Sequence, residues 1–565
     1  MSTANPAPES VVRPRLPRTI TDWVRVFGPG AVIASLTIGT GELIFSTRGG
    51  ALFGYHILFV FVVISLLKWG LVISTSRHMI LTGVHPYERL IELPGPRGWL
   101  PLALLLMAAV CLPVWISFHS GVLGNLTSWL TGTRGWMNGG MDYVWGAAAL
   151  VGVLILSALG GYTLLERVQM FVVTALVLCA GLTLILYRPD WLQLILGVLP
   201  KPLSYPDWLP EKYPDIARHS VWVETTRYVG VIGGAGFDYL AYTSWLREKS
   251  WGVLPGRATP EQLEEIAADP DHEIRKWVNA PVVDCLISFA LIVAFSAVFV
   301  ASGALILGPE QVVPDEDNLL NLQARFVTRI HNWLLPLYVG GAFLTMLGTL
   351  YGTIEIACAV ADEVVRSFFL KWSDSSAMRL RRCVLAWCAP LALGILVWLF
   401  IRQASPVERP DMNITSVSTS ETPERVSASA DTGDSTKIPS AGAPDRSPTP
   451  NKPRLLLMIL TPVNLFTGVL ACGLICFAVI WMDRRWLPSE LQPPLWLTVL
   501  NLVSAAVFFG LGLKGYWDNE NRVVVVGCML GIFITAMIVA ALAEPKVQAL
   551  RNHRPSTELS EDQTQ

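Results

Sequence analysis

The sequence is poor in charged residues. Only 15% of its 565 residues are Asp, Glu, Lys or Arg, whereas a soluble protein usually has about 25%. The net charge of −2 provides no basic surface, so no nucleic-acid partner is predicted. The nine cysteines form no Cys-x-x-Cys pair and no Cys/His cluster at zinc spacing. No nucleophile–base pair or nucleotide-binding loop is evident either, so neither an enzyme nor a bound cofactor is expected.

Hydrophobic residues, by contrast, make up 52% of the chain. They fall into runs of roughly 18–25 residues, the length that crosses a hydrocarbon core of about 30 Å. The amino terminus has no short apolar core followed by a cleavage site, so no cleaved signal peptide is predicted. The chain is therefore expected to be an all-α integral membrane protein with about twelve spans, near 28–50, 54–80, 99–121, 143–161, 167–187, 222–246, 279–307, 334–360, 382–401, 454–481, 493–514 and 522–543.

The charge of the loops predicts the orientation of these spans. Arg- and Lys-rich loops alternate with neutral or acidic ones, and an even number of spans places both termini on one side, predicted to be the cytoplasm of a cell (inner or plasma) membrane. The Ser-, Thr- and Pro-rich stretch 402–453 is too polar to fold. The predicted regions are a cytoplasmic tail at 1–26, nine helices at 27–401, a disordered external loop at 402–453, three helices at 454–543, and a cytoplasmic tail at 544–565.

Two glycine-rich motifs occur at matching places in this array. Gly39-Thr40-Gly41-Glu42 lies in the first predicted span, and Gly234-Ala235-Gly236-Phe237-Asp238 lies in the sixth. Glycine pairs weaken a helix by about 1 kcal/mol per residue. Unwound backbone at membrane depth occurs only where it is buried in protein or lines a cavity. The motifs therefore predict two inverted repeats whose first helices are interrupted at a substrate site. Close helix packing through small residues is the alternative.

Glu42 and Asp238 are the strongest candidate site residues. A carboxylate at the centre of the bilayer costs about 2.5–3.5 kcal/mol on insertion scales unless it faces water or a partner. Hard divalent cations prefer such oxygen ligands together with carbonyls. The pair is thus a candidate metal site, and a structural ion pair is the alternative.

Lys68 lies near the middle of the second predicted span and is the obvious partner for these acids. Its ammonium could act as a tethered cation, exchange a proton during transport, or fill the place that a metal would take. His119 and Glu355 are further candidates for proton transfer, although His119 could equally be a packing residue.

Residues 27–83 resemble the Nramp family of proton-coupled divalent-metal transporters. The resemblance continues through the sixth span, and the motifs that carry it are Gly28-Pro29-Gly30, Phe53-Gly54-Tyr55, Thr82-Gly83 and Leu165-Glu166-Arg167. It implies a LeuT-type fold of two inverted five-helix repeats followed by about two further helices.

The departures from the family fall on its metal site. Where the family has Asp-Pro-Gly-Asn in the first helix, this chain has Gly39 to Glu42, and where the family has Met-Pro-His in the sixth, it has Gly236 to Asp238. The resemblance places the family's carbonyl ligand at Gly233. Without the soft methionine sulfur, an oxygen-only site would favour Mg²⁺ or Mn²⁺. The implied ligand set is Glu42, Asp238, Gly39, Thr40, Gly233 and Gly236.

The leading hypothesis is a proton-driven secondary transporter of divalent metal cations. The first alternative keeps the fold and carries an amino acid or another small organic solute, with Lys68 as the tethered cation. The second is a membrane sensor or scaffold that does not transport. In each case the predicted partners are the lipid bilayer and a small ion or solute, with no required protein partner. The position of Lys68, inside or outside the Glu42–Asp238 pocket, separates the first two readings.

Overall fold

A computed structural model describes residues 17, 19, 22, 28–133, 135–159, 162–252, 257–314, 335–368, 374–404, 455–519 and 521–552. Helices and turns account for all the regular structure within these ranges, which hold no strand. Most of the predicted tail at 1–26, the predicted external loop from residue 405 onward, and the end of the carboxyl-terminal tail from residue 553 lie outside the described residues.

Within the described ranges, twelve helical spans follow one another, and those of the first repeat come before those of the second. The first repeat comprises α2 (Pro29–Thr37) with α3 (Thr40–Phe53), α4 (Ile57–Thr82), α6 (Trp99–Leu130), α7 (Met141–Leu159) and α8 (Tyr162–Tyr187). The second comprises α12 (Val221–Val231) with α13 (Gly236–Glu248), α16 (Asn279–Ser302), α19 (Leu335–Phe368), α20 (Asp374–Ala404), and α21 (Leu455–Asn464) with α22 (Ala471–Trp486). The last two spans are α23 (Leu495–Trp517) and α24 (Arg522–Asn552).

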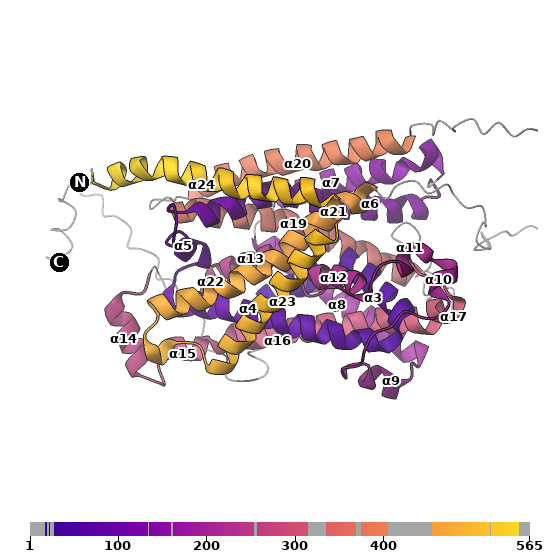
Figure 1. The fold of residues 1–565 in the computed structure, drawn as a ribbon, viewed down its shortest axis with the longest axis horizontal. Coiled ribbons are helices and arrows are strands. Elements are labelled where there is room, and N and C mark those ends of the chain that lie inside the picture. Colours follow the sequence, from indigo (N-terminus) through magenta and orange to yellow (C-terminus); the bar gives the residue numbers. More distant parts are fainter. Residues whose placement is uncertain are drawn as a thin grey trace, which may run out of the picture.

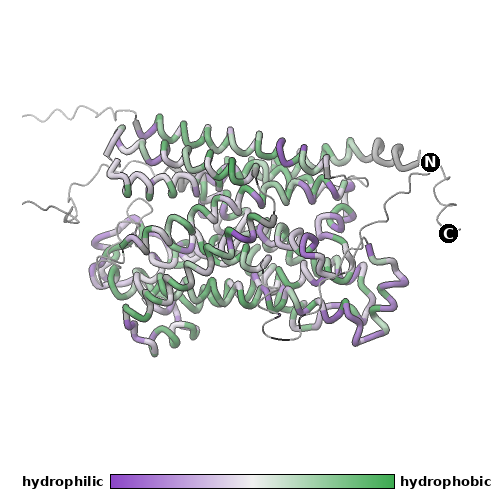
Figure 2. Tube along the Cα trace, turned by 180° about the vertical axis from the view of Figure 1, so that it is seen from behind, coloured by the Kyte–Doolittle hydropathy of each residue, from purple (hydrophilic) through white to green (hydrophobic). Residues whose placement is uncertain are grey.

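Apolar composition accounts for most of these helices. Within the described residues, nine helical segments are long and apolar enough to cross a membrane. Only 11% of the apolar window of α24 is buried, against 78% for that of α19. The apolar windows of α7 and α20 are each 22% buried, so these helices and α24 leave much of their apolar surface on the outside of the bundle, as expected for helices that face lipid. Hydrophobic residues colour most of the length of the long helices (Figure 2). Helix α20 begins at Asp374, eight residues before the predicted span near 382, because a helix can continue past the membrane into polar sequence.

Both predicted interruptions are present. The first span breaks between α2 and α3 at Ile38 and Gly39. The sixth breaks between α12 and α13, where Gly233 (φ +82°) and Gly234 (φ +92°) adopt left-handed backbone conformations that suit glycine. The predicted interruptions of the first and sixth spans are confirmed. A π-helical turn, Leu465–Leu470, also joins α21 to α22.

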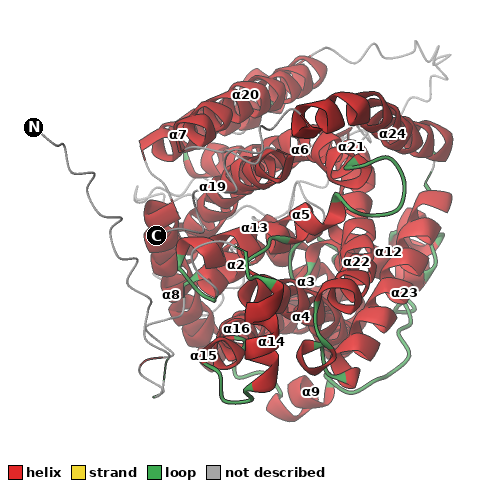
Figure 3. Ribbon diagram, turned by 90° about the vertical axis from the view of Figure 1, so that its left-hand side faces the viewer, coloured by secondary structure: helices red, strands yellow, loops and turns green. Residues whose placement is uncertain are grey.

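The broken helices lie in the middle of the bundle. Seen end-on, α2, α3 and α13 are enclosed by α4, α8, α16, α19 and α22 (Figure 3). Short helices cap the two ends: α5 (Pro86–Leu90), α14 (Pro260–Ala268) and α15 (Glu273–Trp277) at one, and α9 (Trp191–Leu196), α10 (Leu209–Lys212), α11 (Pro214–Ala217) and α17 (Gly308–Glu310) at the other (Figure 1). The two breaks thus lie near each other in the middle of the bundle.

Candidate functional site

Lys68 lies at the break in the sixth span. Its fully buried ammonium donates to three backbone carbonyls at the end of α12: those of Val229 (2.9 Å), Ile232 (2.7 Å) and Gly234 (2.5 Å). The last carbonyls of a helix have no partner within it, and they form the negative end of its dipole. The lysine satisfies them and places a positive charge where unwound carbonyls could otherwise hold a diffusible cation.

Glu42 is in the first turn of α3 and bridges the two broken helices. Its Oε2 accepts hydrogen bonds from the hydroxyls of Ser296 on α16 (2.6 Å) and Ser46 (3.2 Å). Its Oε1 accepts the backbone N–H of Gly233 (3.3 Å) at the break in the sixth span. These donors fully bury the carboxylate and direct it toward α16.

Asp238 is in the first turn of α13. Its Oδ2 accepts the backbone N–H of Ala235 (2.6 Å), which satisfies one of the unpaired amides at the start of that helix. Within the part of the chain that the structure describes, no ion pair joins Lys68 to Glu42 or Asp238. The three charged groups therefore surround the break at separate positions, each bound mainly by backbone or hydroxyl groups.

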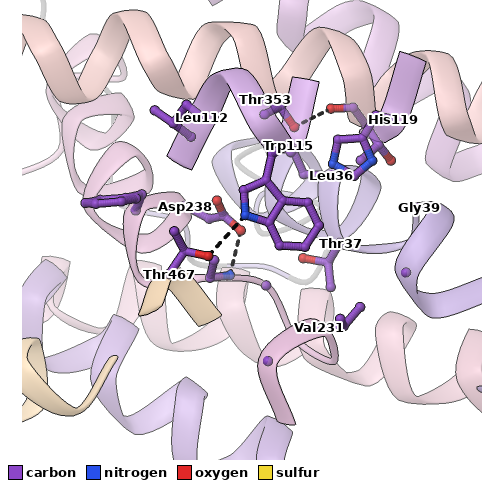
Figure 4. A pocket seen from close by; sticks show the side chains of 16 residues that line it. Leu36, Thr37, Gly39, Leu112, Trp115, His119, Val231, Asp238, Thr353 and Thr467 are labelled. Atoms are coloured by element: carbon purple, nitrogen blue, oxygen red, sulfur yellow. Dashed lines mark hydrogen bonds between the residues drawn. The ribbon is translucent and has the colours of Figure 1, made fainter. Parts of the chain in front are cut away.

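A cavity of about 70 Å³ opens between the two breaks (Figure 4). Trp115 of α6 forms part of its wall: the indole Nε1 donates to the hydroxyl of Thr467 (3.1 Å), and the ring stacks on His119 with centroids 5.4 Å apart. Among the lining residues, Asp238 is the only acid. The described residues that line the cavity are Leu36, Thr37, Gly39, Gly41, Leu112, Trp115, His119, Gly230, Val231, Gly234, Ala235, Phe237, Asp238, Thr349, Thr353 and Thr467.

The structure does not gather the predicted metal ligands around one point. Gly39 and Asp238 line the cavity, whereas Glu42, Gly233 and Gly236 do not. The Gly233 carbonyl accepts the hydroxyl of Tyr239. No group of three or more His, Cys, Asp or Glu residues within the described ranges could hold a metal ion. The ligand roles of these residues remain predictions.

Two of the predicted ligands, Gly39 and Gly236, have other roles in the structure. The Gly39 carbonyl accepts the N–H of Leu43 (3.1 Å) and so begins α3. A Cβ at Gly236 would lie 3.0 Å from that of Ala471, so this glycine allows α13 to pack closely against α22. Thr40 begins α3, and its side chain is outside the described part of the structure.

The two predicted proton-transfer residues lie in different places. His119 lines the cavity beside Trp115. Glu355 does not line it and instead pairs in bidentate fashion with Arg381 of α20, at 2.7 and 2.8 Å. The same guanidinium donates to the carbonyl and hydroxyl of Ser157 on α7, both at 2.8 Å. Glu355 therefore joins three helices, and a part in proton transfer remains a prediction for it.

The structure adds two residues that the sequence reasoning did not select. Thr37, the last residue of α2, lines the cavity two positions before the Gly-x-Gly motif. Asp284 of α16 accepts the backbone N–H groups of Gly30 (2.7 Å) and Gly28 (3.4 Å) and the hydroxyl of Tyr242 (2.8 Å), so it fixes the start of α2. Proximity to a predicted helix break could have indicated Thr37. Asp284 is an acid early in the seventh predicted span, a place that leaves its role ambiguous, because the sequence does not show which groups it binds.

Comparison of the sequence with protein-family models and with curated proteins finds no match. Comparison of the structure finds crystal structures of two mutants of the Eremococcus coleocola manganese transporter. Each is 13% identical in sequence with a TM-score of 0.63, over 95% of this chain and 97% of that chain. The same transporter in complex with an aromatic bis-isothiourea substituted compound gives a TM-score of 0.60 over the same shares of the chains.

These likenesses, together with the two broken helices, establish the fold. The chain is a multi-pass membrane protein with the LeuT-type arrangement of two inverted five-helix repeats and two additional helices, as predicted. At 13% identity the likeness to the manganese transporter identifies the architecture alone.

Proposed function

We propose that the protein is a secondary active transporter whose cargo is a small organic solute, with Lys68 as a permanently tethered cation. The observation that carries this proposal is the position of the Lys68 ammonium against the carbonyls of Val229, Ile232 and Gly234. In LeuT-type carriers such unwound carbonyls coordinate the coupling ion. Here a side chain of the protein takes that place, so the carrier does not need to recruit a metal cation there.

The chemistry of the cavity supports an organic cargo. Its wall combines the apolar surfaces of Leu112, Trp115 and Phe237 with a few hydroxyl groups and one carboxylate. Solute sites have this composition, mostly apolar with a small number of polar groups that orient the ligand. A hard divalent ion instead needs about six oxygen ligands, and even Mg²⁺, which keeps several of its waters, is usually held by one or two carboxylates.

The buried charges point the same way. Glu42 and Lys68 are fully buried and Asp238 is half-buried, and in their ordinary ionisation states the three groups sum to −1. One bound monocation or one proton would neutralise this centre, whereas a divalent ion would leave it at +1. Because uncompensated charge inside the membrane is costly, the balance favours proton coupling or a singly charged cargo.

Divalent-metal transport, as in the Nramp family that residues 27–83 resemble, is the second candidate. It is favoured by the position of Gly39 and Asp238 on the wall of the same cavity, next to the breaks in the first and sixth spans. A metal held there would have to draw its other ligands from threonine hydroxyls and water.

The distribution of basic residues supports a cytoplasmic location for both termini. Arg89 of α5 and Arg275 and Lys276 of α15 lie at the same end of the bundle (Figure 1). Basic loops remain on the cytoplasmic side, so we propose that α5, α14 and α15 face the cytoplasm.

Calorimetric titration separates the two candidates. The full-length protein is titrated with Mg²⁺, Mn²⁺ and Cd²⁺, with Glu42→Gln as a control, and its thermal unfolding is followed with a panel of amino acids and nucleobases. We expect saturable stabilisation by an organic solute and no saturable binding of a metal. Uptake of that solute into proteoliposomes should then follow an inward proton gradient and be abolished by a protonophore. Saturable metal binding that is lost in Glu42→Gln, without any response to organic solutes, would replace this proposal by the metal carrier.

A further inference from the structure

We propose that the cavity contains a subsite for a primary ammonium group, between the Thr37 hydroxyl and the Asp238 carboxylate. The inference rests on the proposed function and narrows its cargo to small organic amines. Three observations carry it: the Thr37 and Asp238 oxygens lie close together beside Gly234, the Thr37 hydroxyl is unpaired, and Asp238 is the single acid among the described residues of the cavity wall.

Gly234 brings the two oxygens close together. A Cβ built on this glycine would lie 3.0 Å from Asp238 Oδ2 and 3.1 Å from Thr37 Oγ1, so the two oxygens lie on the same side of the backbone and within about 6 Å of each other. A single ammonium in the cavity can bridge such a separation, because each N–H···O distance is near 3 Å. The φ of +92° at Gly234 makes any side chain unfavourable there, so no side chain separates the two oxygens.

Thr37 has a hydroxyl that the protein leaves unused. The residue is 7% exposed, and its Oγ1 is buried without a hydrogen-bond partner. Other threonines in the bundle, such as Thr345 and Thr353, donate to the carbonyl four residues earlier in their own helix, at 2.7 and 2.8 Å. A buried hydroxyl without a partner is energetically unfavourable, and this one lines the cavity, so a ligand can satisfy it.

Asp238 determines the sign of the charge that the ligand carries. Its Oδ2 receives one hydrogen bond, from Ala235, and a carboxylate can accept about four. An anion placed beside it would be repelled, whereas an ammonium has three N–H donors for the carboxylate and the Thr37 oxygen. The wall beside the subsite includes the Trp115 indole, which Thr467 holds in position, and an aromatic ring favours a cation placed over its face (Figure 4).

The cavity has room for such a ligand. It measures about 70 Å³, which accommodates a compact amine with a short substituent. An ammonium also brings the one positive charge that compensates the excess carboxylate of the buried centre. The site thus selects for a monocationic amine over a neutral or anionic solute of the same size.

The test is binding of small amines to the full-length protein in a sodium-free, choline-based buffer. Thermal unfolding and calorimetry compare methylammonium and ethylammonium with the neutral ethanol and the anionic acetate. The variants are Asp238→Asn, which keeps an acceptor for the Ala235 amide, and Thr37→Val. Thr345→Val is the matched control, because its hydroxyl is bonded within α19 and does not line the cavity.

We expect the amines alone to stabilise the protein saturably. Asp238→Asn should weaken their binding about tenfold or more and Thr37→Val about threefold to tenfold, while Thr345→Val binds as the wild type does. Equal binding of ethanol or acetate, or amine binding unchanged in both Asp238→Asn and Thr37→Val, would overturn the subsite and leave the organic-solute transporter standing. Binding of divalent metals with no response to any organic probe would overturn both proposals. If sodium ions bind in place of the amines, and Asp238→Asn abolishes that binding, the subsite is one for a metal ion and the ammonium subsite is overturned.

Discussion

The Lys68 ammonium lies 2.7 Å from the carbonyl oxygen of Ile232, the residue that directly follows α12. The second span thereby supplies a cation to the broken end of the sixth. Lys68 therefore has two roles: its hydrogen bonds satisfy the carbonyls at the end of α12, and its positive charge lies at the negative end of the helix dipole.

Lys68→Ala should create a requirement for an external cation. The substitution leaves the Val229, Ile232 and Gly234 carbonyls without their donor, which we expect to lower stability by about 1–3 kcal/mol. A small monovalent ion can then enter the vacated space. The variant should unfold at a higher temperature in sodium chloride than in choline chloride of equal ionic strength, whereas the wild type should not distinguish these salts.

Lys514→Ala serves as the control, because it also removes a lysine but from an exposed ion pair with Asp518 on α23. Such pairs contribute little to stability. If Lys68→Ala unfolds at the same temperature in both salts, the three carbonyls do not form a cation site.

Asp284→Ala should loosen the beginning of the first span. The carboxylate accepts the N–H groups of Gly28 and Gly30, and its loss leaves buried donors unpaired at a cost of about 1–3 kcal/mol. We expect faster hydrogen–deuterium exchange across α2 and little change in α24. Tyr242→Phe, which removes one donor to the carboxylate and keeps both amide bonds, should show a smaller change. Unchanged exchange in α2 would mean that other contacts fix this helix.

The positions of the helix breaks could be predicted because they depend on local chemistry. The glycines of both motifs weaken the helix wherever they occur, and the apolar runs have the length that the membrane requires. The direction of each acid could not be predicted in this way. Glu42 and Asp238 follow similar motifs, yet only Asp238 lines the cavity, because Ser296 of a distant helix binds Glu42. That contact depends on how α3 and α16 pack, which one sequence does not specify.

The contacts of Lys68 and Glu355 could not be predicted from the sequence either. A buried lysine beside two acids suggests an ion pair, but the broken helix exposes carbonyls that compete for the ammonium. Glu355 lies deep in an apolar segment, and its partner, Arg381, belongs to the next helix. Because such partners lie on different helices and far apart in the sequence, the sequence does not show that they pair.

The Glu355–Arg381 pair should stabilise the packing of α19 against α20. Glu355→Ala leaves a mostly buried guanidinium without its carboxylate, which we expect to cost about 3 kcal/mol of unfolding free energy. Replacing both residues by leucine and methionine should recover most of that loss, because two apolar side chains need no charge partner. A double-mutant cycle on unfolding in mild detergent measures the coupling. Additive effects of the two single substitutions would contradict a direct interaction. If a stable double variant loses proton-driven uptake, that loss would support the predicted role of Glu355 in proton transfer.

His85, between α4 and α5, should make stability depend on pH. Its Nδ1 accepts the N–H of Tyr87 (3.2 Å), and its Nε2 lies 3.1 Å from the Leu240 carbonyl, so a neutral ring satisfies both contacts. Burial lowers the pKa of His85 from 6.5 to about 4. The Glu363 carboxylate opposes this shift, and the Arg247 guanidinium adds to it. Between pH 6.5 and about pH 4, His85 in the unfolded chain therefore binds a proton more readily than His85 in the folded protein.

Stability should be constant above about pH 6.5 and fall as the pH decreases toward 4, by up to about 3 kcal/mol in total. His85→Gln cannot titrate and should lose this part of the pH dependence. Unfolding of both proteins is measured from pH 7.5 to 4.5 in the same detergent. If the wild type and His85→Gln lose stability in parallel over this interval, the proton is taken up elsewhere, and the Glu363–Arg247 ion pair, with its partners 2.5 Å apart, becomes the group to examine.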